Sequence, residues 1–320
     1  VDKSVTVLGE AGDRPVVMTD ASTGSSGDTR GWFLHTAGTL TMRNLVLDGA
    51  GYDIYQGIRS YAAGVLDNCS FSNIVFPGYG GVMVAAFGTG NWHIDGCTFG
   101  NIGRIGILAF GAGLDGSSFT NNTYTGKGVG DWLDYACDIS AGAVMTVTGN
   151  TITGCRGVAS SDGSTSAALL VTTYYGAGTT AVIDGNVLTG NSTGVAIGYD
   201  AADLSVVSGT GNDLSGNDSY GVSNTAANTV DFLGNWWGAA SGPYHATQNP
   251  AGTGVPVGDN ILFDPWTGMA GGDIVPVTTG PLNCTQSVTL TFSFTADDYT
   301  PDVFLYNAVV SACLLYTSDA

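Results

Sequence analysis

The chain has few of the residues that build long helices. Its 320 residues include a single glutamate, Glu10, and two lysines, Lys3 and Lys127, against 50 glycines. Because straight-chain residues favour helices and glycine disfavours them, long α-helices are not expected. Long apolar runs are missing as well: the longest, VMVAAF at 82–87, has the length of a strand, whereas a membrane-spanning helix needs about 20 apolar residues. We therefore expect no membrane span.

Positive charge is scarce and unevenly placed. The net charge is −19, and no lysine or arginine follows Arg156, so residues 157–320 carry fourteen aspartates and no cation. Such a field repels nucleic acids and anionic membranes, and it repels uronate polymers unless a divalent cation intervenes. We expect no nucleic-acid partner, and neutral glycans, cationic partners and calcium stay open.

Two metal-binding signatures are missing. The six cysteines form no C-x-x-C pair, which argues against a zinc site. The G-G-x-G-x-D nonapeptide that binds calcium in some repeat proteins does not occur either. A calcium site would have to be built from separate aspartates.

What the chain does have is an internal repeat. A short alternating strand, a turn and a second short strand recur, for example in TMRNLVLDG (41–49), HIDGCTFGN (93–101), TVTGNTITG (146–154) and VIDGNVLTG (182–190). The period-2 alternation predicts strands. Aligned on one register, the units share a marker column: Leu45, Cys69, Cys97, Ser117, Asn150, Asn186, Asn212 and Asn235. The spacings of 24, 28, 20, 33, 36, 26 and 23 residues are typical of a solenoid with loops inserted into a coil of fixed size, here of about eight to ten turns.

The marker column predicts stacked side chains. In a coil that advances by one strand spacing per turn, equivalent residues lie about 4.8 Å apart. We expect the last four members, Asn150, Asn186, Asn212 and Asn235, to form an amide ladder that satisfies the backbone groups of the turns.

Two cysteines share that column. Cys69 and Cys97 would lie on neighbouring turns, at a separation that fits a disulfide and fits two stacked free thiols equally well. Cys137 and Cys155 are candidates for a second pair. A disulfide would favour export to an oxidising compartment.

Over residues 1 to about 268, these repeats resemble the right-handed parallel β-helix of the pectate-lyase-like superfamily. The segment NWWG…SGP…GVPVGDNILFDPW, within 235–266, is similar to the one that closes many secreted bacterial and archaeal β-helix proteins. The resemblance implies the fold and the closing role but no activity, since lyases, hydrolases, adhesins and surface proteins share this fold. The N-T-D, D-D, G-H-G and R-I-K motifs of its hydrolases are missing from the repeats, which argues against polygalacturonase-type hydrolysis.

Three tryptophans belong to this closing segment. Trp236 and Trp237 follow the last ladder asparagine, and an open solenoid end would expose apolar core and unpaired strand edges there. Large rings would cover that core, and Trp266 would return with the final strand. We interpret the three as a cap rather than as a sugar-binding platform.

The remaining residues divide into three parts. We interpret 269–281 as a linker because it is rich in glycine and proline, and 282–312 as the truncated start of a β-sandwich module, because apolar residues alternate from Val288 to Phe294. CLLYTSDA, at 313–320, resembles translated sequencing-adapter sequence. The chain begins without methionine inside a strand pattern, so we expect a natural segment to precede it.

One cluster of cations is a candidate lyase site. A polysaccharide lyase needs a cation or Ca²⁺ to neutralise the uronate and a base to take a proton. Counted from the marker column, Arg104 and Tyr124 stand at position +7 and Arg156 at +6, with Lys127 close behind Tyr124, so all four would emerge at one edge of the coil. The alternative is scattered surface charge on loops.

Aspartates and aromatic residues in the inserted loops are further candidates. Asp131, Asp134 and Asp138 could hold calcium, or they could simply be solvated. The candidate sugar-stacking residues, each of which could equally pack over its own loop, are Tyr79, Trp92, Trp132, Tyr174 and Tyr175.

Together these features predict a secreted or cell-surface monomer that binds polysaccharide or extracellular matrix. The first alternative is a carbohydrate-active enzyme, a Ca²⁺-assisted polysaccharide lyase, and the second is a ligand-free stalk or surface-layer component. Convergence of the Arg104, Lys127 and Arg156 heads would favour the lyase over the binding surface, and a contiguous groove left by the aromatic loops would favour the binding surface over the stalk.

Overall fold

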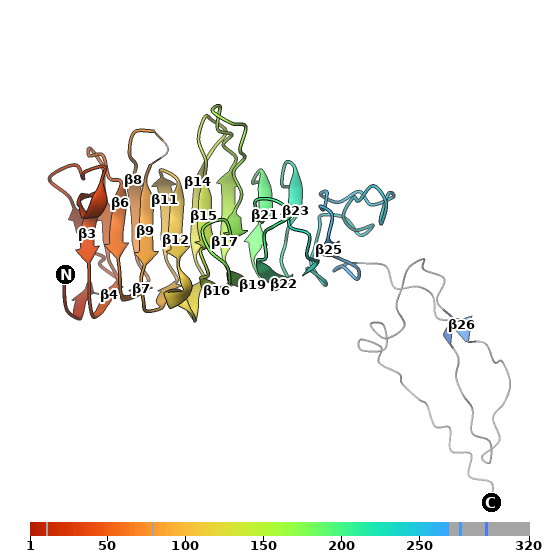
Figure 1. Ribbon diagram of the computed structural model, residues 1–320, viewed down its shortest axis with the longest axis horizontal. Helices are drawn as coiled ribbons and strands as arrows, with labels where there is room; N and C mark the ends of the chain where they lie inside the picture. The colour runs from red at the N-terminus through yellow and green to blue at the C-terminus, as the bar shows by residue number, and fades with distance from the viewer. Residues whose placement is uncertain (11, 79, 269–274, 277–291, 294–320) are drawn as a thin grey trace, which may run out of the picture. The chain divides into compact units, whose positions relative to one another are not determined.

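The computed structural model describes residues 1–10, 12–78, 80–268, 275–276 and 292–293. The chain divides into two units after Gly268. The first unit is an all-β, right-handed parallel β-helix of about nine turns, as predicted, and its turns stack side by side along the chain (Figure 1). In the part of the chain that the structure describes, no helix is long and apolar enough to cross a bilayer.

Three parallel sheets form the walls of the coil. The ten-stranded sheet contains, in order, β1 (Val5–Leu8), β4 (Thr39–Arg43), β7 (Ala63–Asp67), β10 (Trp92–Asp95), β13 (Ser117–Thr120), β16 (Val144–Thr148), β19 (Thr180–Asp184), β22 (Val206–Thr210), β24 (Val230–Asp231) and β25 (Ile261–Leu262). The seven-stranded sheet contains β2 (Val16–Met18), β5 (Val46–Asp48), β8 (Ser70–Ile74), β11 (Thr98–Ile102), β14 (Thr123–Gly128), β17 (Thr151–Cys155) and β20 (Val187–Leu188).

The third sheet has eight strands and carries the candidate site. It contains β3 (Gly31–His35), β6 (Gln56–Ser60), β9 (Val82–Phe87), β12 (Ile105–Phe110), β15 (Tyr135–Ser140), β18 (Leu169–Thr172), β21 (Thr193–Ile197) and β23 (Tyr220–Asn224). Two 3₁₀ turns, η1 (Gly27–Arg30) and η2 (Ala112–Leu114), lie in the connections.

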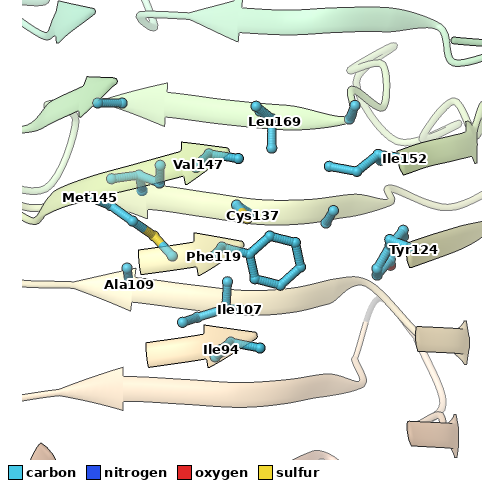
Figure 2. Packing of buried hydrophobic residues seen from close by; sticks show 14 of the residues in the cluster. Ile94, Ile107, Ala109, Phe119, Tyr124, Cys137, Met145, Val147, Ile152 and Leu169 are labelled. Atoms are coloured by element: carbon cyan, nitrogen blue, oxygen red, sulfur yellow. The ribbon is translucent and has the colours of Figure 1, made fainter. Parts of the chain in front are cut away.

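Apolar residues stack in rows inside the coil. In the ten-stranded sheet Ile94 pairs with Phe119 and Phe119 with Val147, and in the eight-stranded sheet Ile107 pairs with Cys137. All of these side chains are fully buried, and Figure 2 shows them directed into the same core. Each fully buried large apolar side chain contributes about 1.5–3 kcal/mol, so the repeated inward rows hold the turns together.

From β4 to β20, the turn between the ten- and seven-stranded sheets is built the same way in every repeat. It has two residues, and the first adopts a left-handed backbone, with φ of 54° at Asn121 and 69° at Gly149. Asparagine and glycine tolerate that region better than other residues do, which is why they recur there. The second residue, such as Asn150, is buried inside the coil.

The buried second residues form the amide ladder. Asn150 donates its backbone N–H (2.9 Å) and its side-chain amide (2.8 Å) to Oδ1 of Asn186. Asn186 repeats both bonds to Asn212, and Asn212 repeats them to Asn235.

One member of the predicted marker column is wrong. Asn122, not Ser117, precedes Asn150 in the ladder and donates to its Oδ1 atom, while Ser117 lies in β13 opposite Met145. The correct column therefore lies five residues later in this turn. The sequence LDGSSFTN (114–121) imitates the preceding repeat, but 3₁₀ turn η2 lengthens the connection before β13.

The cysteines are present as thiols. Cys69, Cys97, Cys137 and Cys155 are all free and buried, and the backbone N–H of Cys69 lies 3.4 Å from Sγ of Cys97. Of the two alternatives, the structure has stacked thiols in the marker column, and Cys137 and Cys155 form no disulfide. These four cysteines therefore give no indication of an oxidising compartment.

The tryptophan segment packs at the last turn of the described coil. Trp237 is fully buried in the core and meets Phe263 edge-on at 6.4 Å. The returning strand is β25, Ile261–Leu262. Trp266 follows this strand, packs against the core, and donates its ring N–H to the carbonyl of Ala240. Trp236 is half-buried.

The second unit contains one described strand pair. β26 (Val275–Pro276) is antiparallel to β27 (Phe292–Ser293). The rest of the predicted linker (269–281), of the β-sandwich fragment (282–312) and the whole adapter-like segment (313–320) lie outside the described residues.

Candidate functional site

Six aromatic side chains lie where strands of the eight-stranded sheet end. We call them the aromatic row: Tyr61, Phe87, Phe110, Tyr175, Tyr174 and Tyr199. Successive ring centroids are separated by 6.2, 5.7, 5.4, 4.9 and 5.1 Å. The row is therefore an unbroken series of ring contacts that crosses several turns of the coil.

Strand register and loops together build the row. Phe87 and Phe110 are the last residues of β9 and β12 and pair in register, so their rings lie on neighbouring turns. On the next turn the register position is Ser140, and the ring of Tyr175, from the loop after β18, contacts Phe110 instead. Tyr174 and Tyr175 are 61% and 67% exposed, so this end of the row is open to a ligand.

A charged group anchors the other end of the row. The Arg59 guanidinium lies 5.1 Å from the ring centre of Tyr61 and 4.9 Å from that of Phe87. Its Nε donates to Asp28 at 2.9 Å, and the Tyr61 hydroxyl donates to the same carboxylate at 2.7 Å. The hydrogen bond from Arg59 is the main cause that lowers the pKa of Asp28. These contacts fix the orientation of the Tyr61 ring.

A carboxyl group lies on the outer side of the same sheet. Asp138, on β15, is flanked in register by Leu108 and Leu170. Its Oδ1 atom and the Nε atom of Arg104 are both buried and have no hydrogen-bond partner among the described residues. Burial raises the pKa of Asp138 from its ordinary 3.8 to about 6, against the lowering effects of Ser140 and Arg104.

The raised pKa of Asp138 predicts a pH-dependent stability. Because the folded-state pKa lies above the unfolded value, the contribution of this group is fully present below about pH 4 and is lost as the pH rises through about 6. Asp138→Asn is therefore expected to be about 1–3 kcal/mol more stable than the wild type at pH 8 and nearly unchanged at pH 4. Urea unfolding at both pH values measures this difference, with the exposed Asp115→Asn as control. A variant less stable than the wild type at pH 8 would mean that the carboxylate has a favourable partner.

Asp134, a predicted calcium ligand, lies in a different place. It is fully buried, and its oxygens accept the Tyr124 hydroxyl at 2.5 Å and the Lys127 backbone N–H at 2.7 Å. Burial is the main cause that raises the pKa of Asp134 to about 6. These two hydrogen bonds hold Asp134, which lies in the loop after β14, against Tyr124 in the core and against the main chain of β14.

Tyr124 does not emerge at the edge of the coil. It is fully buried, pairs in register with Phe99 and Ile152, and points into the core in Figure 2. The position of Tyr124 has to be counted from the true marker, Asn122, which puts it at +2. Counting from Ser117 had put it at +7. An odd shift of five residues moves a strand residue to the opposite face. Burial also raises the pKa of its hydroxyl well above 10.

The predicted cation cluster is only partly brought together. The Lys127 ammonium contacts the carbonyl of Gly103, next to Arg104 in the chain, and lies 4.7 Å from the ring centre of Trp132. Arg156 forms a two-bond ion pair with Asp218, at 2.7 and 3.0 Å. The described residues therefore do not present the base and cations of the lyase hypothesis together.

The three candidate calcium ligands do not converge. Asp131 accepts the backbone N–H and the hydroxyl of Ser160, both at 2.7 Å, while Asp134 and Asp138 have the separate surroundings described above. Over the described part of the chain no three His, Cys, Asp or Glu side chains could hold one metal ion. The structure therefore does not bring the three predicted calcium ligands together.

The predicted sugar-stacking residues lie in different surroundings. Trp92 is fully buried and donates its ring N–H to the carbonyl of Ala62, so it cannot stack on a ligand. Trp132 packs over its own loop, where its N–H reaches the carbonyl of Gly128, and Tyr79 lies outside the described residues. Tyr174 and Tyr175 are in the aromatic row. Four members of this row were not predicted from the sequence: Tyr61, Phe87, Phe110 and Tyr199. Their shared place at or just after strand ends was the available signal.

The chain belongs to the family described as the right handed beta helix region. The family model matches residues 17–173 and 56–236. No curated protein sequence matches the chain. Among solved structures it is similar to the periplasmic alginate epimerase AlgG, with 12% identity and a TM-score of 0.36, over 72% of this chain and 70% of that one.

Proposed function

We propose that this protein is an extracellular or cell-surface β-helix protein that binds neutral polysaccharide along the aromatic row. The observation that carries the proposal is the uninterrupted series of ring contacts from Tyr61 to Tyr199. Aromatic rings offer large apolar faces for sugar rings, and the tyrosine hydroxyls offer hydrogen bonds. A row that crosses turns spaced about 4.8 Å apart suits an extended polymer rather than a small compact ligand.

Charge supports a neutral ligand. Residues 157–268 contain nine aspartates and no lysine or arginine, and the open end of the row, at Tyr174, Tyr175 and Tyr199, belongs to this half. An acidic polymer would meet repulsion there. At the other end Arg59 is already neutralised by Asp28.

The binding proposal is preferred to the lyase because two of the four predicted lyase residues are engaged by other side chains. Tyr124 is buried and bonded to Asp134, and Arg156 is paired with Asp218. The row also argues against a stalk without a ligand, because exposed neighbouring tyrosines have no structural need to contact one another at the surface.

Binding is expected to depend on the exposed tyrosines. The double variant Tyr174→Ala, Tyr175→Ala should bind its polysaccharide at least about tenfold more weakly than the wild type, since exposed aromatic residues at the centre of an interface commonly contribute that much. Affinity electrophoresis in gels that contain cellulose derivatives, xylan, mannan, alginate or polygalacturonate measures the effect, with and without Ca²⁺.

The matched control is Tyr52→Ala. Tyr52 is an exposed tyrosine on the turn between β5 and β6, outside the row, and its loss should leave binding unchanged. Unchanged binding by the double variant would overturn the proposal. Release of unsaturated uronates or reducing ends in the same mixtures would favour the enzyme alternative.

A further inference from the structure

A cavity lies at the C-terminal end of the solenoid. It has a volume of about 550 Å³ and is lined by parts of residues 219–220, 244–247 and 256–259. Cavities of about 300–1,000 Å³ are typical of sites for small ligands. None of the aromatic row lines it.

The main chain builds this cavity on the last strand of the eight-stranded sheet. Next to β23, the N–H of Gly258 donates to the carbonyl of Val222 at 3.0 Å, and the N–H of Gly221 donates to that of Pro256 at 2.9 Å. One layer further, the N–H of Val257 donates to the carbonyl of Tyr244 at 3.1 Å. Backbone hydrogen bonds thus hold the walls in place before any ligand arrives.

The cavity offers two exposed rings and one exposed carboxylate. Tyr220 and Tyr244 are 41% and 45% exposed, and the side chain of Asp259 is 88% exposed. Oδ1 of Asp259 lies 3.2 Å from Nε2 of His245, whereas its Oδ2 has no hydrogen-bond partner among the described residues. The carboxylate can therefore accept hydrogen bonds from a ligand.

Both ring nitrogens of His245 are hydrogen-bonded to other groups of the protein. Nδ1 of His245 accepts the backbone N–H groups of Thr247 at 3.3 Å and Gln248 at 3.1 Å, so Nε2 carries the proton and donates it to Asp259. Neither ring nitrogen is free to remove a proton from a ligand. His245 is therefore not available as a general base at this site.

We propose that this cavity binds a neutral pyranose unit, at a site separate from the aromatic row. The rings of Tyr220 and Tyr244 would contact the apolar faces of the sugar, and Asp259 would accept hydrogen bonds from its hydroxyl groups. A uronate is disfavoured because its carboxylate would face Asp259 in a half of the chain that has no lysine or arginine. Tyr220 begins β23, whereas the row lies where strands end, so the two sites occupy opposite edges of the sheet.

The test uses the full chain and neutral tetrasaccharides. Cellotetraose, xylotetraose, mannotetraose and maltotetraose are compared with tetragalacturonate by saturation-transfer NMR, followed by titration calorimetry of those that bind. At least one neutral probe should bind more tightly than tetragalacturonate. Tyr244→Ala should weaken that binding about tenfold, and Asp259→Asn should weaken it while narrowing the preference for neutral over acidic probes.

The controls separate this site from the row. Tyr174→Ala, Tyr175→Ala should retain the part of the tetrasaccharide binding that Tyr244→Ala weakens, and Tyr244→Ala should retain binding of polysaccharide to the row, so either proposal can fail alone. Tyr220→Ala serves as the second variant if Tyr244→Ala does not fold, as judged by circular dichroism. The proposal is overturned if no neutral probe binds, if tetragalacturonate binds as tightly, or if the folded tyrosine variant binds like the wild type.

Discussion

Trp237→Ala is expected to destabilise the C-terminal turns of the solenoid by about 3–5 kcal/mol, the cost typical of truncating a fully buried large aromatic residue. Trp237 is completely buried, meets Phe263 edge-on, and lies against Gly221 of β23. Its backbone carbonyl also accepts the N–H of Val255 at 2.8 Å. Loss of the ring would leave a cavity in the last turn of the described coil.

The loss of the Trp237 ring should first increase local opening of the C-terminal turns, before the whole coil unfolds. In a solenoid each turn contacts only its neighbours, so a weakened terminal turn opens first. Hydrogen exchange should therefore accelerate in β23, β24 and β25 of Trp237→Ala, with little change near β9. The neighbouring Trp236→Ala is the control, because that ring is only half-buried and should cost clearly less. Normal stability together with lost polysaccharide binding would instead favour the platform interpretation of these tryptophans.

Asn186→Ala is expected to cost about 3–5 kcal/mol of unfolding free energy, because it breaks the ladder in its middle. Oδ1 of Asn186 accepts both N–H groups of Asn150, and its amide donates to the carbonyl of Val147 at 2.9 Å. These groups are buried, and each polar group left without a partner costs about 1–3 kcal/mol. Alanine satisfies none of them.

Urea unfolding followed by circular dichroism measures the loss. Thr151→Ala is the matched control, since Thr151 follows the ladder residue Asn150 but is exposed, and it should stay within about 1 kcal/mol of the wild type. Asn186→Asp keeps the acceptors and removes the donors, so it should also be strongly destabilised. An Asn186→Ala protein as stable as the wild type would show that the ladder is dispensable.

The fold could be predicted from the sequence because its signal is repeated. Many units each show the same alternation and the same asparagine or glycine turn, so an error in one unit leaves the overall architecture intact. The candidate site residues are not repeated from unit to unit, so one error in the register is enough to misplace them. Alternation has a period of two, and placing Ser117 where Asn122 belongs reversed the face of the strand that follows the turn and turned a core tyrosine, Tyr124, into a surface candidate.

The aromatic row could be predicted only in part. Tyr174 and Tyr175 stood out as loop residues, whereas Phe87 and Phe110 were hidden in apolar strand patterns. Their contact with Tyr175 arises because Ser140 occupies the intervening register position and a loop ring fills the gap. Contacts between a strand and a loop from two turns further on depend on loop conformation, which one sequence does not specify.

Two corners of the coil differ in how much change in loop length they tolerate. From β4 to β20, every connection between the ten- and seven-stranded sheets has two residues, whereas the connections from the seven- to the eight-stranded sheet range from two (103–104) to thirteen (156–168). Lengthening a surface loop costs little free energy, and the strands on either side keep their register. Foreign peptides inserted within the exposed stretch 160–165 of this connection should therefore be displayed beside the eight-stranded sheet without disturbing the coil, so the protein could serve as a scaffold for engineered recognition loops.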